Sequence, residues 1–240
     1  LLLLLPSRFQ ASDYLVSHIV IDARIIKTTT GRYVERLLFH LESIDKKNQY
    51  TVLVREQDAG YYIPKNPNFT VKFANYKNYS FGEQFGFLRL LRSLNADLVH
   101  FCQPEQPILY TRKKVTTIHD LTLLKTYNPD KNWFVYHFKQ LVGRFVFRWV
   151  THSSRYVLTP SEFTKNEIIS WYKTDKSKVV RTHLAAELKT SEVKPYSLPS
   201  SNFLLYVGQQ SEYKNIKRLA EAHQKLLPKY PDLQLVLVGK

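Results

Sequence analysis

The sequence predicts an α/β fold, in which the strands of a parallel sheet are joined by crossover helices, and three observations support this class. Short apolar runs alternate along the chain with segments of helical periodicity. The runs are rich in β-branched residues and nearly continuous, which is typical of strands covered on both faces. The 240 residues are 44% hydrophobic and 14% aromatic, which is enough to build one large core or two small ones.

The strands and helices are expected to alternate from residue 17 onward. The first strand is expected within SHIVIDARII (17–26), and a helix within TTTGRYVERLLFHLESI (28–44), where apolar residues recur at helical spacing. This order is the pattern of a parallel sheet with helices packed on its faces. Further strands are expected at 50–54, 69–73, 97–101, 114–118, 156–159 and 178–182.

Composition divides the chain into four parts. Residues 1–16 form an irregular N-terminal segment, and residues 17–190 form an N-terminal α/β domain. The Ser- and Pro-rich segment 191–202 interrupts both periodicities and is interpreted as a linker. Residues 203–240 then give a strand, a helix and a strand, and a piece of about 40 residues rarely stands alone. We interpret it as the beginning of a second, incomplete domain.

Both ends of the chain indicate a fragment. The sequence contains no methionine, and it stops at LQLVLVGK, which is typical of a strand that enters its functional loop. The opening LLLLL is far shorter than the ~20 apolar residues that a membrane span needs. No basic segment precedes it, so it is not interpreted as a signal peptide.

Charge and cysteine content limit the function classes. The 35 Lys and Arg exceed the 20 Asp and Glu, and the net charge of +15 attracts anions in general: nucleic acid, anionic lipid or phosphorylated small molecules. The single thiol, Cys102, excludes a disulfide framework or a cysteine metal cluster within the chain and favours a reducing compartment such as the cytoplasm. No pair of histidines has metal-ligand spacing, so no metal site is predicted.

Two glycine-containing turns are candidate phosphate sites. Gly31 lies between a predicted strand and helix, where backbone amides and the helix dipole can receive a phosphate. An ordinary turn that needs glycine for its backbone angles explains it equally well. In YVGQQSEYKNIKRL, Lys214 precedes a helix N-terminus, a position unfavourable for a cation unless an anion is shared. A solvated lysine is the alternative.

The stretch VTTIHDL (115–121) places His119 and Asp120 at the end of a predicted buried strand. The carboxyl ends of parallel strands face the ligand crevice of such sheets. Both side chains can hydrogen-bond a sugar hydroxyl, and histidine can also move a proton near neutral pH. A strand-end histidine followed by a helix-capping aspartate is the structural alternative.

A basic and aromatic helix is expected at residues 131–155. The stretch has five Lys and Arg, no acid and seven aromatics. A polar stripe with a broad apolar face opposite is expected, at positions 137, 140, 144, 148 and 151. Such a helix can lie against an anionic bilayer. More often, such a helix packs on its own domain with its basic edge in water.

Five blocks in this order resemble one enzyme family. The blocks IDARII with TGRYVERLL, VTTIHDL, LTPSEFTKNEI, and LLYVGQQSEYKNIKRLAEAHQKL are similar to retaining glycosyltransferases of the family-4 type (group 1, mannosyltransferase-like). The resemblance covers nearly all of residues 17–240. It implies the GT-B fold, in which an N-terminal Rossmann-like domain (17–190) shapes the acceptor site. The C-terminal group-1 domain, begun at 203–240, binds a nucleotide-sugar donor in the interdomain cleft without a metal.

The resemblance also implies roles for residues of the first domain. Gly31 matches the loop whose amides approach the donor phosphate and sugar, although relatives often have a second glycine where this chain has Thr29. His119 matches the histidine that contacts the transferred sugar near the reaction centre. Asp120 is its supporting or acceptor-side neighbour.

In the second domain, the resemblance assigns donor-binding residues. Lys214, followed by Asn215, matches the basic residue that neutralises the departing diphosphate. Gly208 matches the glycine that ends the first strand. The family commonly has an arginine where this chain has Gln209, which cannot neutralise phosphate charge. The paired glutamates that hold the donor ribose and sugar belong to the missing part, so we expect the fragment to be inactive.

The implied function is transfer of a hexose from a nucleotide-diphosphate sugar to a glycan or lipid-linked acceptor with retention of configuration. Mannose from GDP-mannose is the expected donor, and no other cofactor is implied. The expected setting is bacterial polysaccharide biosynthesis, in the cytoplasm or peripherally on the inner face of the plasma membrane. The alternative is a basic anion-binding protein without catalysis, at a membrane surface or on nucleic acid. No recognised nucleic-acid motif supports nucleic acid as a partner.

Overall fold

The computed structural model describes residues 16–125, 133–186, 197–198 and 200–239. The chain divides into two compact units: residues up to 125 with 137–185, and 126–136 with the residues from 186 onward. The expected N-terminal segment 1–16 and most of the expected linker 191–202 lie outside the described residues. Each unit is therefore treated by itself.

The first unit is built on a parallel sheet, which confirms the predicted α/β class. Its seven strands run in the spatial order β3-β2-β1-β4-β5-β6-β7. Each of the predicted apolar runs overlaps one of them: β1 (His18–Asp22), β2 (Gln49–Val54), β3 (Phe69–Phe73), β4 (Leu98–Phe101), β5 (Lys114–Thr117), β6 (Tyr156–Thr159) and β7 (Val179–Arg181). The run at 17–26 forms a strand only as far as Asp22, and Ile25 and Ile26 lie buried in a turn.

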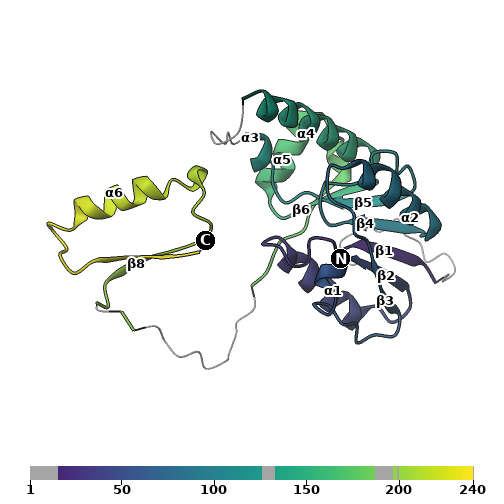
Figure 1. Cartoon of the computed structure of the whole chain (residues 1–240), viewed down its shortest axis with the longest axis horizontal. Coiled ribbons are helices and arrows are strands. Elements are labelled where there is room, and N and C mark those ends of the chain that lie inside the picture. Colours follow the sequence, from purple (N-terminus) through teal and green to yellow (C-terminus); the bar gives the residue numbers. More distant parts are fainter. Residues whose placement is uncertain (1–15, 126–132, 187–196, 199, 240) are drawn as a thin grey trace. The chain divides into compact units, whose positions relative to one another are not determined.

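Helices cover both faces of this sheet (Figure 1). The helices are α1 (Gly31–Ile44), α2 (Leu88–Ser93), α3 (Thr122–Lys125), α4 (Trp133–Ser153) and α5 (Glu162–Tyr172). Adjacent residues of β1 face opposite ways, since Ile21 packs in the core cluster that contains Val34 of α1, whereas Val20 packs with Leu88 of α2. Helices α4 and α5 enclose a third core, through Phe147 and Ile168.

The described part of the first unit also contains three short helices. These are the 3-10 helices η2 (Glu56–Asp58) and η4 (Lys176–Lys178) and the π-helix η3 (Gly82–Phe87), which continues directly into α2. Single-turn π-helices are uncommon and often occur at functional sites. Here η3 carries Glu83 into the buried interior.

The strand order reverses between β1 and β4. The chain proceeds from β1 outward to β2 and β3, and then returns to the other side of β1 to form β4. In open parallel sheets, the crevice at the carboxyl ends of the two strands that flank such a reversal is the usual ligand site. A ligand site is therefore expected beside the segments that follow Asp22 and Phe101.

Helix α4 differs from its predicted pattern. Thr151, expected on the polar stripe, is buried beside Val150, whereas Arg144 and Arg148 are exposed as expected. The outward surface of α4 also carries large apolar side chains, and the apolar residues are therefore not confined to the face opposite the stripe. Within the described residues, no helix is both long and apolar enough to cross a bilayer.

The second unit contains a short β-α-β element. Strands β8 (Phe203–Val207) and β9 (Gln234–Val238) pair in parallel, and the 3-10 helix η5 (Glu212–Lys214) and helix α6 (Ile216–Leu226) connect them. Large parts of Leu205 and Val207 are exposed. A sheet of two strands is marginal by itself, so this element has little of the protection that the first sheet has.

Candidate functional site

His119 lies at the carboxyl edge of the sheet, one residue beyond Ile118 in the segment that follows β5. Its Nε2 is 3.1 Å from the backbone oxygen of Cys102, which follows β4, and the ring of Tyr33 on α1 packs against it edge-on at 4.9 Å. Because a carbonyl only accepts, Nε2 carries the proton and donates, which leaves Nδ1 as the acceptor of the neutral ring. The imidazole ring is thus oriented by two other segments, the one that follows β4 and helix α1.

The electrostatic environment keeps His119 neutral. Burial lowers the pKa of His119, and the opposing effects of the Cys102 carbonyl and the Asp120 carboxylate do not reverse this direction. A neutral imidazole with a fixed tautomer can accept a hydrogen bond from a hydroxyl. The contact of His119 with a transferred sugar stays a prediction.

A second buried histidine supports this edge from inside the sheet. Nε2 of His100 lies 2.9 Å from Oγ1 of Thr117, and the same oxygen lies 3.0 Å from the hydroxyl of Tyr33. Burial lowers the pKa of His100 to about 4, so it is neutral at physiological pH. The chain of hydrogen bonds ties α1 to β4 and β5 and fixes the ring that packs on His119.

Asp120 caps the N-terminus of α3. Its side chain is exposed, and Oδ1 accepts a hydrogen bond of 2.8 Å from the amide of Thr122, the first residue of α3. This is the capping geometry that the sequence offered as the alternative. Asp120 also acts on His119 through its charge, which favours the protonated imidazole.

Gly31 is required by close packing. A Cβ atom there would lie 2.0 Å from the backbone oxygen of Ile26, a distance that no side chain tolerates. Its amide donates to the carbonyl of Thr28 at 2.9 Å, so this N–H is already used within the turn. The structural alternative accounts for Gly31 through the approach of two backbone segments, and its role toward a donor phosphate stays a prediction.

The candidate donor residues of the second unit lie between β8 and α6. The amide of Gly208 donates to the carbonyl of Val238 at 2.9 Å, and the carbonyl of Gln209 accepts from the hydroxyl of Tyr206 at 2.8 Å. The structure thus places both residues at the carboxyl ends of the paired strands, where a ligand of a parallel sheet is expected.

Lys214 and Asn215 lie at the N-terminus of α6. Asn215 has a left-handed backbone conformation with φ of 56°, and the Lys214 side chain is exposed, with its Nζ 5.0 Å from the centre of the Tyr213 ring. The first turn of α6 contains Lys217 and Arg218 and no acid. Three cations therefore surround the positive end of the helix dipole, an arrangement that an anion would stabilise.

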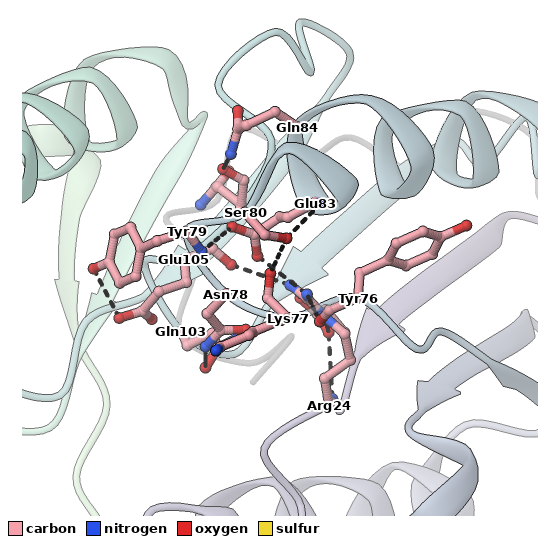
Figure 2. A network of polar contacts seen from close by, with 12 residues as sticks. Arg24, Tyr76, Lys77, Asn78, Tyr79, Ser80, Glu83, Gln84, Gln103 and Glu105 are labelled. Atoms are coloured by element: carbon pink, nitrogen blue, oxygen red, sulfur yellow. Dashed lines mark hydrogen bonds and ion pairs between the residues drawn. The ribbon is translucent and has the colours of Figure 1, made fainter.

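Arg24 is the buried centre of a polar network that the sequence reasoning missed (Figure 2). Its guanidinium donates from Nε and Nη2 to the two carboxylate oxygens of Asp22, both at 2.8 Å. Nη1 donates to Oε1 of Glu83 and the carbonyl of Tyr76, both at 3.1 Å, and Nη2 also reaches the carbonyl of Glu105 at 3.2 Å. All five N–H groups are used.

The network continues to the surface through Tyr79. Glu83 accepts the Tyr79 amide at 2.8 Å, which holds this residue in a left-handed conformation with φ of 56°. The Tyr79 hydroxyl donates to Oε1 of Glu105 at 3.0 Å (Figure 2). Burial raises the pKa values of Glu83 and Glu105, although Arg24 opposes this. The network therefore locks together the segments after β1 and β4, which flank the strand-order reversal.

The only sequence signal for this network was a charged pair, Asp22 and Arg24, at the end of an apolar run. The structure brings His119, Asp22 and Arg24 to one edge of the first sheet, while Gly208, Lys214 and their neighbours belong to the second unit. Among the described residues, no group of three or more His, Cys, Asp or Glu side chains could hold a metal ion.

Comparisons with known proteins agree with this geometry. The sequence profile of Glycosyltransferase Family 4 matches residues 30–188, more than half of the chain. No curated protein matches the sequence.

Two solved structures show the same fold. The apo form of the lipopolysaccharide outer core galactosyltransferase WaaB is similar at 13% identity with a TM-score of 0.55, over 93% of this chain and 68% of that one. The UDP co-structure of MnaA from S. aureus is similar at 14% identity with a TM-score of 0.50, over 92% of this chain and 62% of that one. The fold is that of the GT-B glycosyltransferases. The chain belongs to glycosyltransferase family 4.

Proposed function

We propose that this chain supplies the acceptor-side domain and the first part of the donor domain of a retaining, metal-independent hexosyltransferase. The observation that carries this proposal is His119, a neutral histidine with a fixed tautomer at the carboxyl edge of the sheet. Its position beside the strand-order reversal is the one that binding sites of such sheets occupy. Family membership supplies the reaction class.

In the proposed reaction, the bond between the anomeric carbon and the donor phosphate breaks, and the acceptor oxygen forms a new bond on the same face. The leaving phosphate takes the proton of the acceptor hydroxyl. His119 accepts a hydrogen bond from the transferred sugar through Nδ1, and Asp120 supports it by holding the segment after β5 to the start of α3. Lys214, Asn215 and the amides near Gly31, Gly208 and Gln209 receive the phosphates, and Lys214 stabilises the charge that develops on them.

We propose a mannosyl donor, GDP-mannose, and a glycan or lipid-linked acceptor in bacterial polysaccharide assembly on the cytoplasmic side. The blocks that resemble the mannosyltransferase-like branch support this choice. The exposed apolar side chains of β8 and β9 support an incomplete donor domain, because further strands or helices normally cover such surfaces. This chain alone is accordingly expected not to turn the donor over, and the test of donor binding uses the protein with a complete donor domain.

Binding is therefore the first test. A donor at about 100 times its Kd should raise the free energy of unfolding by about 2.7 kcal/mol, since it binds only the folded state. A panel of GDP- and UDP-sugars in a thermal-shift assay should single out GDP-mannose. Lys214→Ala should reduce the shift, whereas Lys225→Ala, at the other end of α6, should leave it unchanged. The proposed donor site is wrong if no sugar nucleotide shifts the transition.

The second candidate function is a basic anion-binding protein, which the net charge of +15 favours. Such binding is dominated by counterion release and weakens steeply with salt. Duplex DNA titrated at two salt concentrations distinguishes the two functions. Tight, salt-sensitive DNA binding together with no response to any sugar nucleotide would favour this alternative.

A further inference from the structure

Helix α4 exposes a row of large apolar side chains. Leu141, Phe145 and Trp149 follow one another at intervals of four residues and are 68%, 53% and 40% exposed. The rings of Phe145 and Trp149 stack with their centres 6.4 Å apart. The exposed guanidinium groups of Arg144 and Arg148 flank this row on the same helix. A helix that only packed on its own domain would turn such apolar side chains inward.

Helix α5 extends the row. Phe163 and Trp171 are 68% and 43% exposed, and Nζ of Lys125 lies 4.9 Å and 5.4 Å from the centres of their rings. The two helices lie on the same face of the sheet (Figure 1). A hollow of about 490 Å³ joins them, lined by Leu141, Arg144, Phe145, Arg148, Trp171 and Tyr172. We call this the α4–α5 surface.

The charge of the α4–α5 surface rests on its arginines. Lys125 forms an ion pair with Glu167, so these two residues neutralise each other. Glu162 pairs with Lys165 and Arg181. Helix α4 contains no Asp or Glu, and among the described residues Arg144 and Arg148 form no ion pair, so both add positive charge beside the apolar row.

The apolar row and the two arginines together indicate which partner binds the α4–α5 surface. A second copy of the chain would bring two proteins of charge +15 together, which electrostatic repulsion disfavours. A soluble polyanion would use the arginines and leave the apolar row in water. An anionic bilayer satisfies both halves, because its phosphates pair with arginine and its interface accepts aromatic and aliphatic side chains.

We propose that the α4–α5 surface docks this protein peripherally on an anionic bilayer. Leu141, Phe145, Phe163 and Trp171 enter the boundary between headgroups and acyl chains, and Arg144 and Arg148 bind the lipid phosphates. This docking does not depend on which donor the protein uses. It would hold the acceptor-side unit at the surface where a lipid-linked acceptor resides.

The test uses vesicles of phosphatidylcholine alone and of phosphatidylcholine mixed with phosphatidylglycerol. The protein should co-sediment with the anionic vesicles and much less with the neutral ones, and the Trp fluorescence should shift to the blue. Replacing both arginines, Arg144→Gln and Arg148→Gln, should weaken anionic binding about 30-fold, from about 1 kcal/mol for each charge near the surface.

A second variant tests the contribution of the apolar side chains to membrane binding. Leu141→Ser with Phe145→Ser should weaken binding at least about tenfold even at low salt, with the circular dichroism unchanged because both side chains are exposed. The matched control is Phe39→Ser, a 53% exposed phenylalanine on α1, which should bind as the unchanged protein does. Equal binding of the Leu141 and Phe145 variant would overturn the proposal. So would self-association through this surface without vesicle binding, or competition by DNA that depends on the arginines alone.

Discussion

Arg24 illustrates how one buried residue can hold separate segments of a fold together. Its five donors bind two carboxylates and two backbone carbonyls from three separate segments, and its guanidinium lies 4.0 Å from the centre of the Phe87 ring. Removal of one partner from a buried, paired set leaves the others without compensation, which typically costs 3–5 kcal/mol. The network therefore positions the segments that follow β1 and β4 and is not free to bind a ligand through Arg24.

The residue scale is also where sequence reasoning was most limited. His119 could be singled out because strand ends in parallel sheets face the crevice, a rule that needs only local sequence. Arg24 could not be singled out, because its role depends on a hydrogen bond to Glu83, which lies 59 residues away in the sequence. Asp120 and Gly31 were assigned two interpretations each, and the hydrogen bond to Thr122 and the contact with Ile26 support the structural one.

His100 should make stability depend on pH. Its pKa is about 4 in the fold and about 6.5 when unfolded, so the unfolded chain binds the proton first. Its contribution to stability is present above pH 6.5 and is lost as the pH falls toward 4, by about 3 kcal/mol. His100→Gln removes this dependence, and its side-chain amide can still bond Thr117.

The measurement is urea unfolding between pH 7 and pH 4. The difference in unfolding free energy between the unchanged protein and His100→Gln should change by about 3 kcal/mol over this range. The raised pKa values of Glu83 and Glu105 act with the opposite sign, but equally in both proteins, so they cancel in the difference. His40→Gln, an exposed position on α1, is the control. Parallel curves for the His100 variant would refute the assignment.

At the scale of elements, the strands were predictable and the short helices were not. A β-branched apolar run is enough to predict a strand from local sequence. Helix α1, with 14 residues, is long enough for its apolar stripe to be recognised. Helix α2 has six residues and follows a π-helix, a length too short for any periodicity. The apolar run at 17–26 extends past the end of β1 because burial alone does not distinguish a strand from a buried turn.

The junction of the first turn with α1 should tolerate no side chain at residue 31. Gly31→Ala would place Cβ within 2.0 Å of the Ile26 oxygen, and the backbone of either the turn or α1 must move. Overpacking of this kind typically costs 1–3 kcal/mol, and two backbone segments in contact put this case at about 3 kcal/mol or more. Chemical denaturation measures the loss.

The matched control is Gly82→Ala at the start of η3. There the nearest atom to an added Cβ is Oγ of Ser80 at 3.5 Å, an ordinary contact. The change should leave stability equal or raise it by up to about 1 kcal/mol, since alanine loses less conformational entropy than glycine. A Gly31→Ala protein as stable as the Gly82→Ala protein would contradict the packing explanation.

At the scale of the whole molecule, the two units differ in how their sheets are protected. Strands β1 and β4 lie inside a sheet of seven strands with helices on both faces, and Val20 and Val99 are 0% exposed. Among the residues that the structure describes, β8 and β9 pair only with each other, and Val207 is 69% exposed. The blocks of family resemblance predicted the family that matches residues 30–188. The different burial of the strands in the two units could not be predicted, because their apolar runs have similar composition.

Hydrogen exchange should therefore separate the two units. Central strands of a stable domain exchange only on global unfolding, which requires 5–15 kcal/mol, whereas a two-stranded sheet opens locally at little cost. Peptides that cover β8 and β9 should exchange roughly a hundredfold faster than those of β1 and β4. A bound sugar nucleotide should slow exchange around Gly208 to Asn215 without changing β1, because the amides of this central strand are already paired within the sheet. Equal protection of all four strands would show that β8 and β9 are covered by another surface. Their exposed side chains would then no longer support an incomplete donor domain.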